Sequence, residues 1–222
     1  MVENTSDESK AVIFDLDGVL VSTDEYHYRS WQRMADEEGI PFDREFNHRF
    51  RGVSRMECLD MLLEQTDRDY TDTERQKLAD RKNGYYREMI AELSPQDMLP
   101  GARGTIDELQ DRKVDIAVAS GSKNAPFIMD KIGLKNEIET LVCGLDIENS
   151  KPHPEVFLKA AEQLGARPER SLVVEDAQSG IEAANRAGMH ALGIGAHELH
   201  GADQTVPSLA DISVDAMLDI IG

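Results

Sequence analysis

The feature that most limits the fold is an alternation of short apolar segments with helical ones. The apolar segments have the length of strands and lie at residues 12–14, 114–120, 140–144, 171–176 and 190–195. Between the later ones, apolar residues recur at helical spacing over 124–132, 154–164 and 177–187. Each of these is followed by a glycine, a residue that commonly ends a helix. Alternation of this kind predicts a doubly wound, Rossmann-like α/β domain with a parallel sheet.

One long block departs from this alternation. Residues 23–94 show amphipathic helical spacing throughout and contain no convincing strand. The sequence SPQDMLPG, rich in proline and glycine, then reads as a linker back to the alternating pattern. We therefore expect residues 1–22 and 95–222 to form the α/β core, and residues 23–94 to form an inserted all-helical cap.

Composition narrows the classes of partner. The 222 residues include 43 acidic and 24 basic side chains, a net charge of −19 that argues against nucleic acid and anionic membranes as partners. The polar start MVENTSDESK and the lack of a long apolar segment favour a cytoplasmic protein. Cys58 and Cys143 lack metal-ligand spacing and are expected to be packing thiols. The acidic excess also suits a salt-rich cytoplasm, an alternative that a thermal melt in added salt would test.

Acidic pairs stand at the ends of two predicted strands. Asp15 and Asp17 follow the first strand, and residues two apart in an extended segment point to the same side. Glu175 and Asp176 end another strand. Ligands of doubly wound folds bind at the carboxyl ends of strands, so these acids are expected to meet. Their oxygen atoms would suit a hard cation such as Mg²⁺.

Donors suited to an anion follow a third strand. The sequence SGSKN, residues 120–124, offers hydroxyl and backbone N–H groups at the start of a helix, and Lys151 adds a positive charge. Acids, Mg²⁺ and anion donors together indicate a phosphate substrate, while neither a Gly-x-Gly-x-x-Gly turn nor a Walker loop is present. Such a site would let one aspartate attack phosphorus while the other transfers a proton.

The motifs FDLDGV, ASGS, SKPHPEVF and VVEDAQSGIEAANRAG resemble, in order and position, the four motifs of the haloacid dehalogenase superfamily of phosphotransferases. The resemblance implies that Asp15 forms an aspartyl phosphate and that Asp17 is the general acid and base. It implies a Mg²⁺ site formed by Asp15, Asp17, Glu175 and Asp176, with Asp17 contributing a backbone carbonyl. It also assigns Ser120, Gly121 and Lys151 to the transferring phosphoryl group.

The cap segments TDEYHYRSW, RGVSRMECL and LADRKNGYYREMI resemble the β-phosphoglucomutase family of this superfamily. Such enzymes interconvert β-D-glucose 1-phosphate and glucose 6-phosphate. The resemblance implies β-glucose 1,6-bisphosphate as intermediate and activator. A mutase needs a second phosphate site, for which the chain offers Arg55, Ser122, Lys123 and Asn124.

The same resemblance assigns roles within the cap. It implies that His27 and Lys82 form a pair that couples sugar binding to acid and base alignment, and it places Thr23 near the hinge. Trp31 would line the sugar pocket, with packing in the cap core as the alternative.

The resemblance also implies a specificity loop at Gly52, Val53 and Ser54. Arg51 precedes it at a position that is often lysine, which leaves the sugar preference open.

Two other functions remain open. A sugar-phosphate phosphatase of the same fold would pass the phosphoryl group from Asp15 to water, and a catalytically silent protein would bind sugar phosphates only. In each case we expect a monomer whose partner is a small sugar phosphate.

Overall fold

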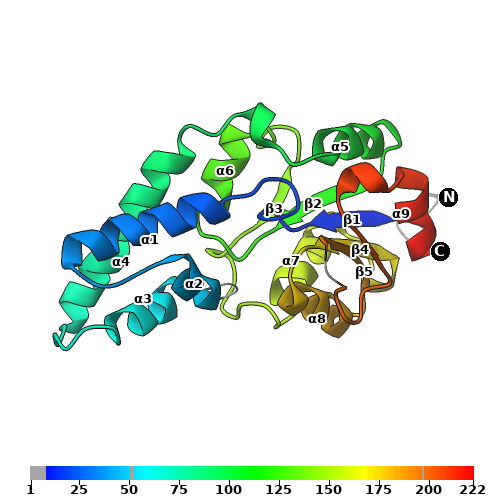
Figure 1. Ribbon diagram of the computed structural model, residues 1–222. Helices are drawn as coiled ribbons and strands as arrows, with labels where there is room; N and C mark the ends of the chain where they lie inside the picture. Colours follow the sequence, from blue (N-terminus) through cyan, green and yellow to red (C-terminus); the bar gives the residue numbers. More distant parts are fainter. Residues whose placement is uncertain (1–8, 51–52, 197) are drawn as a thin grey trace. The chain divides into compact units, whose positions relative to one another are not determined.

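A parallel sheet of six strands forms the centre of the α/β part of the chain (Figure 1). The computed structural model describes residues 9–50, 53–196 and 198–222. The strands are β1 (Ala11–Phe14), β2 (Asp115–Ala119), β3 (Thr140–Val142), β4 (Ser171–Glu175), β5 (His190–Ile194) and β6 (Gln204–Val206). They lie in the order β3-β2-β1-β4-β5-β6, and all pairings are parallel. The predicted doubly wound fold is confirmed.

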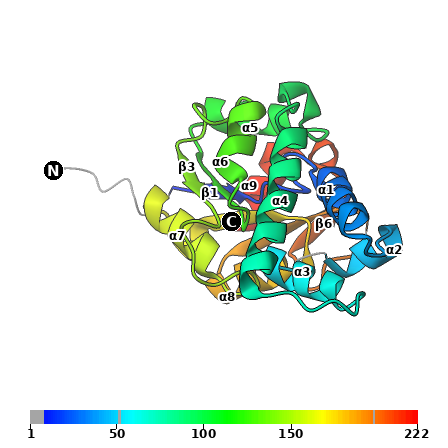
Figure 2. The same ribbon diagram turned by 90° about the vertical axis from the view of Figure 1, so that its left-hand side faces the viewer.

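Helices cover both faces of this sheet. They are α5 (Ala102–Asp111), α6 (Ala125–Lys131), α7 (Glu155–Leu164), α8 (Gln178–Ala187) and α9 (Val214–Ile221). Helices α7 and α8 pack together against one face, and α5 and α9 lie on the other (Figures 1 and 2). Gly165 and Gly188 end α7 and α8 with φ of 67° and 73°, as their positions in the sequence predict.

The register of β1 positions the site. Phe14 of β1 pairs with Val174 of β4 on one side and with Val118 of β2 on the other. The strand order changes direction at β1, because β2 and β3 extend to one side and β4 to β6 to the other. Residues just beyond Phe14 therefore lie at the switch point where doubly wound sheets bind ligands.

The chain divides into two compact units. One, the helical unit, is Thr23–Leu93, and the other, the α/β unit, is Ser94–Gly222 with the chain up to Ser22. The helical unit contains α1 (Asp24–Glu38), α2 (Arg44–Asn47), α3 (Arg55–Leu63) and α4 (Asp72–Ile90), and its described residues form no strand. Among the described residues, 3₁₀ helices lie at His48–Phe50, Pro95–Asp97, Pro168–Arg170 and Leu209–Asp211. In the parts of the chain that the structure describes, no helix combines the length and apolarity that a membrane span requires.

Two elements were not expected from the sequence. Helix α5 begins after Gly101, which has φ of 84° and no capping side chain, so the usual start signal is missing. Strand β6 has only three residues, QTV, of which Val206 alone is apolar and buried. The equally short β3 was predictable because it belongs to the apolar segment at 140–144, whereas β6 lies in no such segment.

Candidate active site

Polar side chains follow the carboxyl ends of β1, β2 and β4. The backbone N–H of Asp15 donates to the carbonyl of Val174 at 2.9 Å, so Asp15 continues the hydrogen-bond ladder of β1. Glu175 is the last residue of β4, and Ser120 follows β2. Asp15, Ser120 and Glu175 are 7%, 3% and 2% exposed. The sheet therefore holds these three predicted site residues in fixed positions that are buried from solvent.

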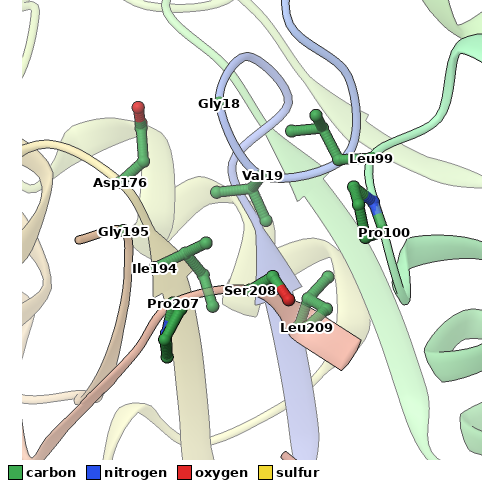
Figure 3. A pocket seen from close by; sticks show the side chains of 10 residues that line it. All are labelled: Gly18, Val19, Leu99, Pro100, Asp176, Ile194, Gly195, Pro207, Ser208 and Leu209. Carbon is green, nitrogen blue, oxygen red and sulfur yellow. The ribbon is translucent and has the colours of Figure 1, made fainter. Parts of the chain in front are cut away.

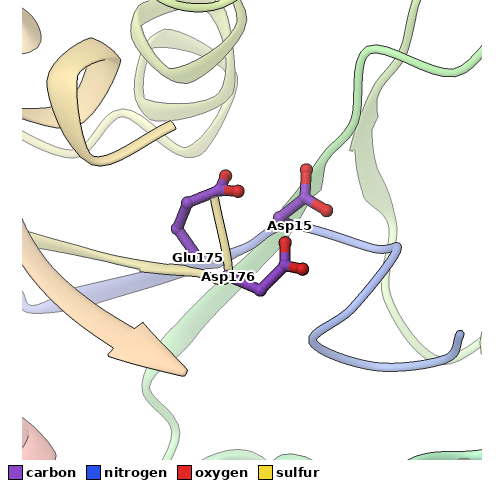
Figure 4. A group of neighbouring side chains, drawn as sticks. All are labelled: Asp15, Glu175 and Asp176. Carbon is purple, nitrogen blue, oxygen red and sulfur yellow. The ribbon is translucent and has the colours of Figure 1, made fainter. Parts of the chain in front are cut away.

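Three carboxylates converge at this edge (Figure 4). One oxygen from each of Asp15, Glu175 and Asp176 lies within 4.8 Å of the others. A set of oxygen donors this close suits a hard divalent cation, which would also relieve the repulsion between like charges. Asp17, the fourth residue predicted for the metal, is half-buried and not part of this group. Its backbone instead bridges to Val21 in the turn after β1.

Lys151 lies against two of these carboxylates. Its Nζ donates to Oδ1 of Asp15 at 2.5 Å and to Oε2 of Glu175 at 2.7 Å, and its side chain is 12% exposed. Burial by itself lowers the pKa of Lys151, but attraction to Asp15 and Glu175 outweighs it and leaves the pKa above its ordinary value. The lysine therefore carries a positive charge beside the carboxylates throughout the neutral range.

Glu175 shows what burial does to a carboxylate at this edge of the sheet. Burial raises the pKa of Glu175 to about 7, although the attraction of Lys151 acts in the opposite direction. Its Oε1 also accepts from the backbone N–H of Ala177 at 3.1 Å. The carboxylate thus depends on cationic and N–H partners to keep its charge.

The anion-binding segment predicted at residues 120–124 is a tight turn between β2 and α6. Oγ of Ser120 accepts from the N–H of Ser122 at 3.1 Å, and Oγ of Ser122 accepts from the N–H of Asn124 at 3.2 Å. Gly121 and Lys123 are exposed within this turn. Nζ of Lys151 lies 3.5 Å from the carbonyl of Ala119, so the turn starts beside the lysine.

Two glycines pack against the acidic side chains, a role that the sequence did not indicate. Gly18 has φ of 88°, and a Cβ there would collide with the carboxylate of Asp176. A Cβ at Gly180, in α8, would collide with the carboxylate of Glu175. The spacing of Gly180 from Glu175 on the next helix could have suggested such a contact, whereas nothing in the sequence links Gly18 to Asp176.

A hollow of about 400 Å³ opens beside Asp176 within the α/β unit (Figure 3). The turn after β1 contributes Gly18 and Val19, and Leu99 and Pro100 come from the segment before α5. The rest of the wall comes from the ends of β5 and β6 and the residues that follow them. The lining is mostly apolar, and the sequence did not predict it.

The helical unit brings together three of its predicted residues. Nζ of Lys82 lies 2.9 Å from Nδ1 of His27, whose ring stacks on Tyr86 with centroids 4.1 Å apart. The Tyr86 hydroxyl donates to Oγ1 of the buried Thr23 at 3.0 Å. Burial and the nearby Arg55 lower the pKa of Lys82 to about 7. Burial, followed by the charges of Lys82 and Arg55, also holds the pKa of His27 well below its usual range.

The remaining predicted residues of the helical unit differ in their surroundings. Trp31 is 3% exposed and packs edge to face on Phe50 at 5.3 Å, which fits the alternative that it belongs to the unit's core. Ser54 caps α3 and Val53 is half-buried just before it. Arg55 is the first residue of α3, and burial lowers its pKa. Arg51 and Gly52 lie outside the described residues.

This fold and site define a class of protein, the doubly wound phosphotransferases that use a strand-end aspartate, a buried lysine and an acidic metal site. The sequence profile of the haloacid dehalogenase-like hydrolase family matches residues 9–188, and the chain belongs to this family.

Relatives within the family share nearly the whole length of the chain. The β-phosphoglucomutase of Bacillus subtilis (strain 168) is 38% identical over 211 residues, covering 94% of this chain and 93% of that protein. The crystal structure of β-phosphoglucomutase from Clostridium difficile superposes with a TM-score of 0.87 at 34% identity, over 96% and 97% of the two chains. A phosphorylated carbohydrates phosphatase of Thermotoga maritima is 29% identical, covering 81% of this chain and 82% of that one. The resemblance to the superfamily and to its β-phosphoglucomutases is confirmed.

Proposed function

We propose that the chain acts as a Mg²⁺-dependent β-phosphoglucomutase, interconverting β-D-glucose 1-phosphate and glucose 6-phosphate through β-glucose 1,6-bisphosphate. The observation that carries the proposal is the ammonium of Lys151 between Asp15 and Glu175, in a chain 38% identical to a β-phosphoglucomutase over 94% of its length. The same site without the lysine would repel a phosphoryl group.

The proposed chemistry has two half-reactions. In the first, Asp17 takes the proton from the free hydroxyl of the sugar monophosphate, whose oxygen attacks the aspartyl phosphate, forms the bisphosphate and releases the carboxylate of Asp15. The bisphosphate then turns over, so that its other phosphate lies beside Asp15. In the second, a carboxylate oxygen of Asp15 attacks phosphorus, the bond from phosphorus to the sugar oxygen breaks, and Asp17 gives that oxygen a proton, which restores the aspartyl phosphate.

Charge balance explains why the acids need cationic partners. A carboxylate about 4 Å from a doubly charged phosphoryl group faces roughly 8 kcal/mol of repulsion at an intermediate dielectric. Lys151 and the Ser120–Gly121 turn would hold the transferring group and offset part of this. Mg²⁺, held by Asp15, Glu175 and Asp176 with the carbonyl of Asp17, would neutralise charge on the phosphoryl oxygens.

The helical unit is proposed to act as the cap. Arg55, with Ser122, Lys123 and Asn124, would bind the phosphate that is not reacting. Binding would bring the cap down, exclude water from the aspartyl phosphate and orient the sugar hydroxyl beside Asp17. The His27–Lys82 pair would link sugar binding to that alignment.

A single assay tests the proposal. Purified protein receives β-glucose 1-phosphate, Mg²⁺ and a trace of glucose 1,6-bisphosphate, and glucose 6-phosphate and free phosphate are followed in the same samples. We expect fast formation of glucose 6-phosphate with little free phosphate, and loss of turnover in Asp15→Asn. Free phosphate as the main product would contradict a mutase.

A sugar-phosphate phosphatase is the second candidate, favoured by the 29% identity to the Thermotoga maritima phosphatase. In that case water would take the phosphoryl group from Asp15. Lys82→Ala separates the two, because a mutase that relies on the His27–Lys82 pair loses turnover, whereas an unchanged turnover would favour the phosphatase. A silent binding protein would form no Mg²⁺-dependent trifluoride complex at Asp15.

A further inference from the structure

We infer that Glu155 is a positioning residue for Lys151: its carboxylate anchors the loop before Lys151 and thereby sets how firmly the site holds a phosphoryl group. The inference rests on one part of the proposed function, namely that Lys151 binds that group. Nothing in the motif pattern assigns this role, since the first residue of α7 is an ordinary place for an acid near a helix N-terminus.

The contacts of Glu155 are those of a loop anchor. Its Oε1 accepts from the backbone N–H of Glu148 at 3.1 Å and from Nζ of Lys159 at 2.8 Å. Its Oε2 accepts from the backbone N–H of Asn149 at 2.9 Å and from Nδ2 of Asn149 at 3.0 Å. The side chain is only 13% exposed. Three of these four donors belong to the loop that leads to Lys151, and none is an N–H of α7.

The loop is held at further points by charged side chains. Nζ of Lys159 donates to the carbonyl of Asp146 at 2.5 Å, so the Glu155–Lys159 pair holds both sides of the turn at 146–149. Beyond Lys151, Nη1 of Arg186 in α8 donates to the carbonyl of Pro152 at 3.0 Å. The side chain of Lys151 therefore projects from a segment whose backbone is held on both sides by side chains of helices that pack on the sheet.

A fixed backbone matters because the ammonium of Lys151 has a narrow target. It must lie within hydrogen-bond distance of both Asp15 and Glu175, at 2.5 and 2.7 Å. A lysine side chain has four rotatable bonds. A loop without these anchors would add backbone freedom, and this conformational entropy would be lost whenever a phosphoryl group binds. Misplacement of a binding group by about 1 Å can reduce a reaction rate roughly 100-fold.

The test variant is Glu155→Gln, which keeps the size of the side chain. The amide carries no charge. Its NH₂ group is itself a donor, and it would have to face either the donors of Asn149 or those of Glu148 and Lys159. The matched control is Glu162→Gln, the same change at an exposed position of the same helix. Asn149→Ala, which removes one of the four donors, is a milder second variant if Glu155→Gln folds poorly.

The readout is the affinity for inorganic phosphate in Mg²⁺, measured by calorimetry on the folded protein, with turnover and melting temperature recorded in parallel. We expect Glu155→Gln to weaken phosphate binding roughly tenfold and to lower kcat, Asn149→Ala to weaken binding about two- to threefold, and Glu162→Gln to match wild type. A crystal structure of Glu155→Gln should show the loop at 146–151 displaced.

Two results would overturn the inference. One is a folded Glu155→Gln protein with the phosphate affinity of Glu162→Gln, even if it melts at lower temperature, because this result would mean that Glu155 only stabilises the fold. The other is a wild type that binds no phosphate. If the expected affinity pattern holds but wild type does not convert β-glucose 1-phosphate, the proposed function fails and the positioning role of Glu155 stands.

Discussion

At the scale of single residues, the position of the Asp176 carboxylate depends on Gly18, because a glycine has no side chain to occupy the same space. Gly18→Ala should weaken Mg²⁺ binding about tenfold or more, because the new methyl group would occupy the space of the Asp176 carboxylate. It should also cost roughly 1 kcal/mol of stability, since φ is 88° at this position. Calorimetry with Mg²⁺ and urea unfolding measure the two effects separately.

Gly39→Ala is the control for this change. Gly39 ends α1 with φ of 68°, and nothing lies within 4 Å of a Cβ placed there. It should lose similar stability and keep full Mg²⁺ affinity. Equal Mg²⁺ affinities in the two variants would show that Gly18 does not hold Asp176 in place.

Lys82 predicts a pH dependence of stability in the helical unit. Burial lowers its pKa from an ordinary 10.5 to about 7, with Arg55 adding to the effect, while Cys58 opposes it and His27 is the facing polar group. Between pH 7 and 10 the unfolded chain therefore binds a proton at Lys82 that the folded chain does not, so the free energy of unfolding rises with pH. Below pH 7, keeping the charged Lys82 buried lowers the free energy of unfolding by at most about 5 kcal/mol.

Urea unfolding of wild type and Lys82→Met between pH 6 and 10 measures this penalty. The variant should be more stable at pH 6, and its advantage should shrink as pH rises through 7 to 10. Lys77→Met, at an exposed position of the same helix, is the control. A constant difference between wild type and Lys82→Met would mean that Lys82 keeps its proton in the folded state.

Much of the α/β site was predictable at this scale because its residues follow recognisable strands. Asp15, Ser120 and Glu175 could be placed together from strand ends alone, and the structure brings them and Lys151 to one edge. The contacts of Gly18 and Glu155 were not predictable, because each depends on the path of a loop. Loop paths follow from tertiary packing and not from local periodicity.

At the scale of elements, α4 depends on a reciprocal cap. Oγ1 of Thr71 accepts from the N–H of Glu74 at 3.3 Å, and Oε2 of Glu74 accepts from the N–H of Thr71 at 2.9 Å. Thr71→Ala should destabilise the helical unit by about 1 kcal/mol, while Thr73→Ala, exposed two residues later, should cost less. Chemical denaturation of both variants measures the difference, and equal losses would contradict a capping role.

Elements were predictable in proportion to their length and start signals. The predicted strand at 171–176 became β4, Ser171–Glu175, and the predicted helix at 177–187 became α8, Gln178–Ala187. Helix α5 was missed although its apolar residues recur at helical spacing, because its glycine start offers no capping side chain. Strand β6 has a single apolar residue, Val206, and so produces no recognisable apolar run.

At the scale of the whole molecule, acidic side chains exceed basic ones by 19, so repulsion among them opposes the compact state. Added salt shortens the distance over which these charges act, from about 10 Å at 0.1 M to about 3 Å at 1 M. The melting temperature should therefore rise by several degrees between low salt and 1 M KCl, since about 1 kcal/mol corresponds to roughly 2–4 °C in a chain of this size.

Calorimetric melts in KCl, with sucrose at matched osmolality as the control, separate screening from general solute effects. Sucrose raises stability by exclusion from the protein surface without screening charge. A larger rise in KCl than in sucrose that levels off near 1 M would reflect screening alone. A rise that continues well beyond 1 M, where little repulsion remains to be screened, would support adaptation to a salt-rich environment. A melting temperature that does not change with KCl would mean that the acidic side chains lie too far apart for their repulsion to oppose folding. The interpretation as adaptation to a salt-rich environment would then be dropped.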